Sequence, residues 1–438
     1  MVDLKIMENF LLQISVIKES LKIELEEFEI DPSDIVIAII HNKFIEYYNK
    51  NEIKDKFNYG KDLEEKIKEI VEISIKKNKM FRKLNDLISV RESTENPTEC
   101  ELYIPNSAAE AFVHKILNNG KNDSECVFKK QDLTIRTAII FICISFENLC
   151  AEILREQFKL GLMDSKLSDK SLTYNDLKMI KNIDDAKELL IEREIDSFFR
   201  DKFKVWFENL DKRLNIIKHF DINENLSRID ELFQRRNLYV HSNGVVNGIY
   251  VKSVEGTSYT TGDSIVTDID YIENMIRSVV EVAWYVYFSY CCRIYKDETE
   301  EFFNGINELL LNNLKDGTVA IPTIYKMFEK DKKITQQLKL MAFFNRCLYY
   351  KVNNNLSVVM DELANFDTSV YSPEYGMVKS IILDEDDAFE RTEKYINTIS
   401  GDEAFTTMSW PVFNIVRNRP EFKELFSKKL RDILDFEG

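Results

Sequence analysis

The stretch from residue 231 to 250, ELFQRRNLYVHSNGVVNGIY, contains the residues of this chain best suited to chemistry. Arg236, Asn237 and His241 lie within it, and residues four apart share a face if the stretch is helical. Arginine holds a phosphate through its planar fork and keeps its charge, whereas histidine exchanges a proton near neutral pH. This set suits metal-independent RNA cleavage, in which a 2'-hydroxyl attacks the neighbouring phosphate and charge builds on the phosphoryl oxygens.

The pattern around Arg236 predicts a helix from 226 to about 241. Five residues follow one another at spacings of three and four, as on the buried stripe of an amphipathic helix: Leu226, Ile229, Phe233, Arg236 and Val240. Ser242, Asn243 and Gly244 would end the helix as a C-terminal cap and are not expected to bind a ligand. The pattern therefore places an arginine where a leucine would ordinarily pack.

A structural interpretation of the same residues stays open. A histidine in the last turn of a helix interacts favourably with the helix dipole. An arginine at the edge of a stripe can extend its charge to solvent or pair with a carboxylate such as Asp230. Arg213 and His219 form another Arg-to-His pair, although a leucine follows that arginine instead of a polar residue. Spacing alone does not separate a catalytic role from a structural one.

The residues around this stretch resemble a known family. The stretch RRNLYVHSNGVVNGIYV, the sequence FENLCAEILR about ninety residues upstream, and an aromatic helix downstream resemble the HEPN domain of prokaryotic RNases, toxins and phage-defence proteins. The family motif is Arg, a polar residue, three residues and His, and residues 236 to 241 match it at every defined place. The resemblance covers roughly residues 130 to 298.

The resemblance implies a role for each motif residue. Arg236 would bind and stabilise the scissile phosphate, His241 would transfer a proton or orient the 2'-hydroxyl, and Asn237 would position the histidine. HEPN sites usually face each other across a dimer, and this chain has one complete motif, so a homodimer is expected. The implied biology is a regulated toxin or an effector of abortive phage infection, whose flanking helical regions hold the site inactive or sense a trigger.

Two neighbours of the motif are candidates for RNA contact. Arg235 would either contact the RNA or be only a solvated surface cation. Tyr239 would either stack on an unpaired base, as aromatic side chains do in RNA-binding proteins, or pack within the protein.

Length and composition predict an all-α protein of more than one domain. A chain of 438 residues exceeds what one core normally organises. It has only 12 Gly and 7 Pro, whereas sheets and their hairpins consume such turn residues. The net charge of −17 disfavours a broad basic surface for duplex DNA but leaves room for a small positive cleft.

We expect three regions: 1–125 as an N-terminal helical region, 126–298 as a HEPN-like bundle, and 299–438 as helix pairs. In the first region, helices are expected at 3–28 and 34–49, with loops at 95–110 and 118–126. In the bundle, helices are expected at 133–160, 185–218, 226–241 and 268–295, with an irregular or β-like excursion after residue 244.

The last region is expected to resemble tetratricopeptide arrays, because its helix pairs repeat at a mid-thirties length. The expected pairs are 336–351 with 356–365 and 373–383 with 388–397, and a closing helix is expected at 409–426. Such pairs would present a concave surface to a protein or peptide partner.

Other chemistries find little support. The chain has no GxxxxGK[ST] or GxGxxG phosphate loop and no HExxH or paired His/Cys set, so no cofactor or metal is expected. The acidic run DEDDAFE at 384–390 fits the solvated start of a helix better than a two-metal nuclease site. The seven cysteines include no CxxC and indicate a reduced, cytoplasmic protein.

No membrane association is expected. The N-terminus lacks the positive start and continuous apolar block of a signal peptide. The most apolar run, 137–146, has about half the length of a bilayer span, and Glu147 follows it directly.

One alternative from another class stays open: a non-catalytic HEPN-fold scaffold that recognises a partner through its helical repeats. The acidic charge and the single motif support it, whereas the complete set of Arg236, Asn237 and His241 favours the enzyme.

Overall fold

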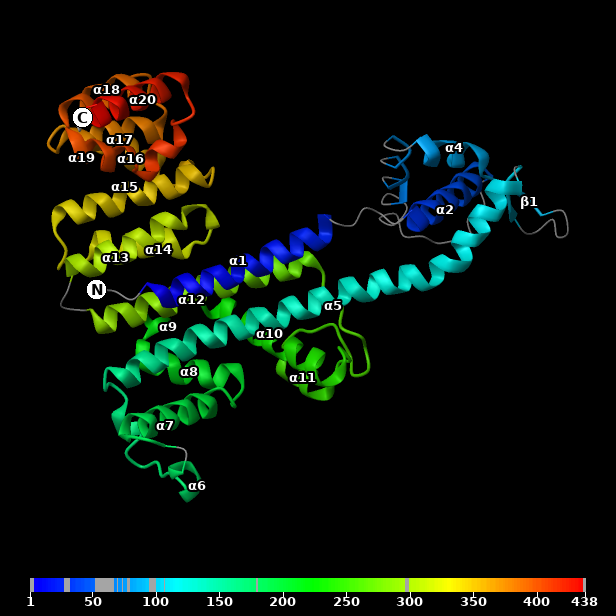
Figure 1. Ribbon diagram of the computed structural model, residues 1–438, viewed down its shortest axis with the longest axis horizontal. Helices are drawn as coiled ribbons and strands as arrows, with labels where there is room; N and C mark the ends of the chain where they lie inside the picture. The colour runs from blue at the N-terminus through cyan, green and yellow to red at the C-terminus, as the bar shows by residue number, and fades with distance from the viewer. Residues whose placement is uncertain are drawn as a thin grey trace. The chain divides into compact units, whose positions relative to one another are not determined.

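The computed structural model describes residues 4–26, 32–51, 67–105 except 69, 73, 77–78 and 94–99, 107–178, 180–295 and 299–435 (Figure 1). Helix accounts for 75% of the chain and strand for 3%, so the protein is all-α, as its low glycine and proline content predicts. The chain divides into two compact units. One comprises Met1–Ser15 and Ile139–Gly438, and the other comprises Val16–Ala138.

The unit Val16–Ala138 has a core of its own. Its elements include α2 (Pro32–Lys50), α4 (Lys79–Leu87), β1 (Ser89–Glu92), β2 (Cys100–Tyr103) and the beginning of α5 (Ser107–Lys159). Strands β1 and β2 form an antiparallel pair in which Arg91 lies opposite Glu101 and forms an ion pair with it at 2.9 Å. Part of the segment expected to be a loop is therefore a strand. Aliphatic and aromatic side chains fill the core, among them Val36, Ile39, Phe81, Leu84 and Ile88.

Two helices, α1 (Lys5–Glu26) and α5, run from one unit into the other. The expected loop at 118–126 is wrong, because α5 is one helix of 53 residues that continues through it. A single glycine costs about 1 kcal/mol inside a helix and does not by itself end one, and residues 107–159 contain no proline. The expected domain boundary at 125/126 consequently lies within α5, and the division between the two units falls at 138/139.

The other unit contains the expected bundle. Its helices are the later part of α5, α6 (Tyr174–Leu177), α7 (Ile183–Phe198), α8 (Phe203–Leu214), α9 (Ile216–His219), α10 (Asn223–Ser242) and α12 (Ile269–Ile294). Aromatic rings join three of them, because the Phe203 ring of α8 lies 5.0 Å from both Trp206 and Phe233, and Trp206 lies 6.1 Å from Phe146 of α5. Sixteen residues of α12 are buried, which explains its long aromatic and aliphatic run.

The segment after α10 is irregular, as expected. Asn243 and Gly244 have positive φ angles of 47° and 79° and end the helix, which confirms the predicted cap. A short helix, α11 (Gly248–Ser253), follows, and Val245 forms an isolated antiparallel bridge with Ser264.

Further helices follow α12, and those expected at 336–351, 373–383 and 388–397 are among them. They comprise α13 (Thr299–Asn312), α14 (Ala320–Lys330), α15 (Gln336–Val352), α16 (Met360–Ala364), α17 (Pro373–Leu383), α18 (Ala388–Thr398), α19 (Gly401–Met408) and α20 (Pro420–Asp435) (Figure 1). The predicted closing helix is instead a 3-10 turn, Pro411–Ile415, followed by α20, which Pro420 begins. Phe288 of α12 lies 5.8 Å from Phe302 and 5.6 Å from Phe328, so these helices share a core with the bundle.

One stretch within α5, Leu133–Lys159, is long and apolar enough by composition to cross a bilayer, with a hydropathy of 1.8. In this protein, 56% of its most apolar window is buried against other helices. The core helix of a globular protein has the same properties, so this stretch is weak evidence for a membrane span.

Candidate functional site at the end of helix α10

The last two turns of α10 hold Arg236 against α5. Nη2 of Arg236 donates to Oε1 of Glu147 at 2.9 Å, and the two side chains are 24% and 22% exposed. The guanidinium also lies 5.6 Å from the centre of the Phe233 ring. The arginine is therefore fixed in place but still reaches solvent.

The surroundings of this ion pair are poorly solvated. Burial raises the pKa of Glu147, although the charge of Arg236 and its hydrogen bond oppose that shift. Burial also raises the pKa of Cys143 and Cys150, the two thiols on either side of Glu147 in α5, so both remain protonated at neutral pH. Nε of Arg236 is buried and has no hydrogen-bond partner among the described residues. This side of the guanidinium faces the interior, where the Cys143 thiol is a polar neighbour.

Asn237 and His241 complete the motif on the exposed surface of α10. Both side chains are exposed, one helical turn apart. Oδ1 of Asn237 accepts a long contact of 3.4 Å from Nη1 of Arg236, and no hydrogen bond between described residues joins Asn237 to His241. The structure therefore places the amide beside the arginine rather than as a support for the imidazole.

The predicted buried stripe is only partly correct. Ile229 and Phe233 are buried, but Leu226 is half-buried and Val240 is 48% exposed. The buried residues of α10 are Ile229, Leu232, Phe233, Gln234, Arg235, Leu238 and Tyr239. The arginine that occupies a core position is thus Arg235, and its neighbour Arg236 lies at the edge of the buried face.

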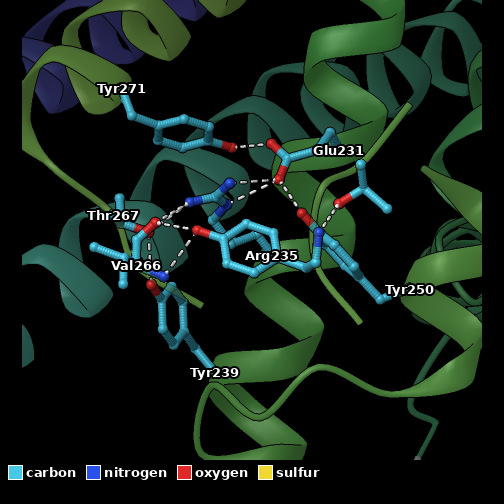
Figure 2. A network of polar contacts seen from close by, with 9 residues as sticks. Glu231, Arg235, Tyr239, Tyr250, Val266, Thr267 and Tyr271 are labelled. Carbon is cyan, nitrogen blue, oxygen red and sulfur yellow. Dashed lines mark hydrogen bonds and ion pairs between the residues drawn. The ribbon is translucent and has the colours of Figure 1, made fainter. Parts of the chain in front are cut away.

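Arg235 belongs to a network of polar contacts that joins α10, α11 and α12 (Figure 2). The Glu231 carboxylate accepts from Nε of Arg235 at 2.9 Å and from the hydroxyl of Tyr250 at 2.6 Å. It also accepts a very short hydrogen bond from the hydroxyl of Tyr271, whose ring lies 3.9 Å from the Arg235 guanidinium. One carboxylate is therefore shared by an arginine and two tyrosines.

The same arginine fixes the segment that leads into α12. Nη1 of Arg235 donates to the carbonyl of Val266 and to Oγ1 of Thr267, both at 2.8 Å. The Tyr239 hydroxyl lies 2.6 Å from the same Thr267 oxygen. Figure 2 shows both side chains turned toward this segment.

These contacts correct the expectation for Arg235 and decide between the two alternatives for Tyr239. Arg235 is 7% exposed, so it is neither a solvated surface cation nor free to contact RNA. Tyr239 is also buried and packs within the protein, which was one of its two expected roles. Burial and the charge of Glu231 raise the pKa of Tyr250 and Tyr271. Both phenols therefore stay protonated at neutral pH.

The other acidic and basic groups singled out in the sequence lie elsewhere. Asp384 ends α17 with a φ of 55° and pairs with Lys351 and Arg419, and Asp387 pairs with Arg391. This acidic run therefore stabilises helix ends. In the described part of the chain, no three His, Cys, Asp or Glu side chains gather as metal ligands would.

Comparison of the chain with protein-family models, with curated proteins and with solved structures found no match. The resemblance of residues 130 to 298 to HEPN domains rests on the motif and its surroundings. Sequence reasoning did not identify Glu147 or Glu231 as partners of the two arginines. Glu147 had one visible signal, since it interrupts the apolar face directly after the most hydrophobic run of the chain.

Proposed function

We propose that this protein is a cytoplasmic, metal-independent HEPN-type endoribonuclease that cuts RNA at a composite site in a homodimer. The observation that carries the proposal is the arrangement at the end of α10. Arg236 is fixed by Glu147 yet partly exposed, and Asn237 and His241 are exposed within the following turns of the same helix. A fixed cation and an imidazole are the types of group that phosphodiester cleavage by a 2'-hydroxyl uses.

The reaction would proceed by transesterification. The 2'-oxygen forms a bond to phosphorus while the bond from phosphorus to the 5'-oxygen breaks, which leaves a 2',3'-cyclic phosphate and a 5'-hydroxyl. One proton leaves the 2'-hydroxyl and another reaches the departing 5'-oxygen. The two copies of His241 in a dimer can serve as base and acid, and Arg236 stabilises the charge on the phosphoryl oxygens.

Glu147 acts on this site as a positioning residue. Its carboxylate accepts a hydrogen bond from Nη2 of Arg236, so the guanidinium is held at the edge of α10 before RNA binds. Preorganised charges stabilise a transition state without reorganisation at the moment of reaction. Glu147 also offsets the charge of the arginine when no phosphate is bound.

A second copy of this chain is the partner that the surface beside the motif fits. Four exposed apolar side chains lie on or next to the two helices that the Arg236–Glu147 pair joins: Phe141, Ile144, Val240 and Val245. An isologous interface places the same patch of both copies in contact, which would bring two motifs together.

The biological role would be that of a regulated toxin or an effector of abortive phage infection. An RNase that is always active harms its own cell, and the helical regions that flank the bundle would keep it inactive until a trigger arrives. A protein partner or trigger would bind these flanking regions.

The alternative function is a HEPN-fold scaffold without turnover. It is favoured by a hollow of about 420 Å³ among the helix pairs, lined in part by Asn307, Phe344, Tyr375 and Trp410. A hollow with aromatic walls and a few amides suits a peptide or small ligand. A scaffold would use this hollow and would have no need of His241.

The test compares the purified wild type with Arg236→Ala, His241→Ala and Arg228→Ala on total cellular RNA in excess chelator. Arg228 is the matched control, because it is an exposed arginine of the same helix whose ion pair is with the exposed Glu224. We expect new RNA ends with 2',3'-cyclic phosphate from the wild type and from Arg228→Ala. Each motif variant should lose about a hundredfold or more in rate.

Two results would contradict the enzyme. Cleavage that persists in both motif variants would place the activity elsewhere. Absence of cleavage by the wild type, even after extract of infected cells is added as a source of trigger, would favour the scaffold.

A further inference from the structure

A cationic hollow lies at the other end of the bundle, where α8, α9 and α12 all end. It has a volume of about 340 Å³ and is lined by Arg213, His219 and Arg293 together with Met327 of α14. Arg213 and His219 are the second Arg-to-His pair of the sequence, for which the HEPN-type site has no role. In a chain with a net charge of −17, the gathering of three basic side chains around one hollow needs a structural or functional explanation.

Local backbone structure brings these side chains together. Asn215 has a φ of 56°, which ends α8 and lets α9 begin one residue later. Oδ1 of Asp211 accepts from the backbone amide of Ile217 at 2.9 Å and fixes this turn. Nη1 of Arg293 then donates to the carbonyl oxygen of Arg213 at 2.7 Å, so the end of α12 is tied to the end of α8.

Among the residues that the structure describes, the two arginines lie together without a carboxylate partner. Partial burial and the nearby charge of Arg293 lower the pKa of Arg213. Glu194 acts on Arg213 only through space, because its own ion pair is with Lys170 at 2.6 Å. The charge of Asp331 acts through space on the thiol of Cys292. No ion pair with a carboxylate of the described residues is formed by Arg213 or Arg293. An anion between them would relieve this repulsion.

Helix dipoles explain part of this arrangement but not all of it. Arg213, His219 and Arg293 each occupy the last turn of a helix, where a cation is favourable. That effect stabilises each residue singly. It does not account for three helix ends that converge on one hollow, each with a basic side chain on its wall.

The remaining wall is largely apolar, although Asn215 and Ser289 also line it, and its apolar part suits a flat, uncharged group. Phe220 and Phe288 are buried at its base with ring centres 6.2 Å apart, and Leu214 and Met327 contribute aliphatic surface. The planar guanidinium group of arginine binds phosphate oxygens through paired hydrogen bonds. Ligand sites of a few hundred cubic ångströms typically combine such polar groups with an apolar surface.

We propose that this hollow binds a small phosphate monoester of nucleotide size, with the phosphate on Arg213 and Arg293 and the base against the apolar wall. The site is separate from the motif at the end of α10 and does not depend on the proposed ribonuclease activity. It includes Met327, so a bound ligand would contact both the bundle and the helix pairs that follow it.

The test measures binding of adenosine monophosphate to the full chain by calorimetry and by thermal shift, with adenosine and inorganic phosphate as separate probes. We expect saturable binding of the monophosphate, a rise in the melting temperature, weaker binding of phosphate, and none of adenosine. Arg213→Gln and Arg293→Gln should each weaken binding about tenfold or more. Arg213→Lys, which keeps the charge but loses the fork, should also bind more weakly.

Control variants separate this site from the motif. Arg228→Gln and Arg236→Gln should bind the monophosphate like the wild type, and circular dichroism should show that every variant is folded. Binding that survives both Arg213→Gln and Arg293→Gln, or that Arg236→Gln abolishes, would overturn the proposal. So would the absence of binding by adenosine, guanosine and cytidine monophosphates at about 10 mM, a concentration that detects even millimolar affinity.

Discussion

Two adjacent arginines of α10 have opposite surroundings. Successive residues of an α-helix point about 100° apart, so Arg235 faces α11 and α12 while Arg236 faces α5. Arg235 is enclosed by Glu231 and two tyrosines. Arg236 has one carboxylate partner and a buried Nε without a hydrogen bond among the described groups. The first arginine is suited to hold the fold, and the second is 24% exposed and still reaches solvent.

Replacement of Arg235 by methionine should destabilise the protein strongly. The change leaves the Glu231 carboxylate buried without its cation, which typically costs about 3–5 kcal/mol. Tyr239→Phe removes one hydrogen bond of the same network and should cost about 1 kcal/mol. Urea unfolding gives both values. If Arg235→Met unfolds at the same urea concentration as Arg228→Met, the network does not hold this part of the fold.

At the scale of elements, charged side chains join the ends of the C-terminal helices. Asp384 ends α17 and pairs with Lys351 of α15 and with Arg419, which directly precedes α20. Burial opposes ionisation of this carboxyl, but the hydrogen bonds from Lys351 and Arg419 outweigh burial and hold the pKa of Asp384 below its usual value. Arg346 of α15 also joins neighbouring helices. It is buried and pairs with Glu329 of α14 at 2.5 Å and with Glu362 of α16 at 2.9 Å.

The lowered pKa of Asp384 gives a prediction about pH. A carboxyl with a depressed pKa in the folded state stabilises the protein above its unfolded pKa, and this contribution is lost as pH falls through the folded value. We expect Asp384→Asn to lower the free energy of unfolding by about 1 kcal/mol at pH 7, because the side chain is 46% exposed and solvent weakens its ion pairs.

The difference between the wild type and Asp384→Asn should shrink below about pH 4. Asparagine tolerates the positive φ of this position, so the backbone is not strained. The exposed Asp386→Asn serves as the control and should have little effect at either pH. A gap that stays constant down to acid pH would show that charge is not the cause. Thermal unfolding at several pH values measures the effect.

At the scale of the whole molecule, the proposed dimer gives a further prediction. Ile144→Glu and Val240→Glu each place a charge at an exposed apolar side chain of α5 or α10, on the surface where a second copy is proposed to pack. Each should raise the dimer dissociation constant about tenfold or more and should reduce RNA cleavage in proportion. Sedimentation at several protein concentrations measures the dimer.

The matched control for the dimer is Val370→Glu, a change at an exposed valine between α16 and α17. It should leave both dimerisation and cleavage unchanged. Because Ile144 and Val240 are partly exposed in the single chain, their replacement should change the stability of the monomer little. A wild-type chain that remains monomeric at micromolar concentration while it cleaves RNA would contradict the composite site.

The sequence by itself determined the all-α class, most helices after residue 130 and the motif on the last turns of α10. Scarce glycine and proline, apolar periodicity and the Asn243–Gly244 cap are local signals, and local signals are readable without tertiary structure. The break predicted within α5 was wrong because a glycine in an Asn-rich stretch resembles a loop, whereas one glycine does not end a helix.

Only the tertiary structure decided which arginine of α10 is buried and which partners each one has. Glu147 lies 89 residues from Arg236 in the chain, and Thr267 lies 32 residues from Arg235. Helical periodicity leaves an uncertainty of one residue in the position of the buried face, and that single step exchanges the surroundings of the two arginines. The hollow beside Arg213 is likewise created by three helix ends, which the sequence does not place together. Contacts between distant segments depend on how helices pack, and packing is a property of the whole fold.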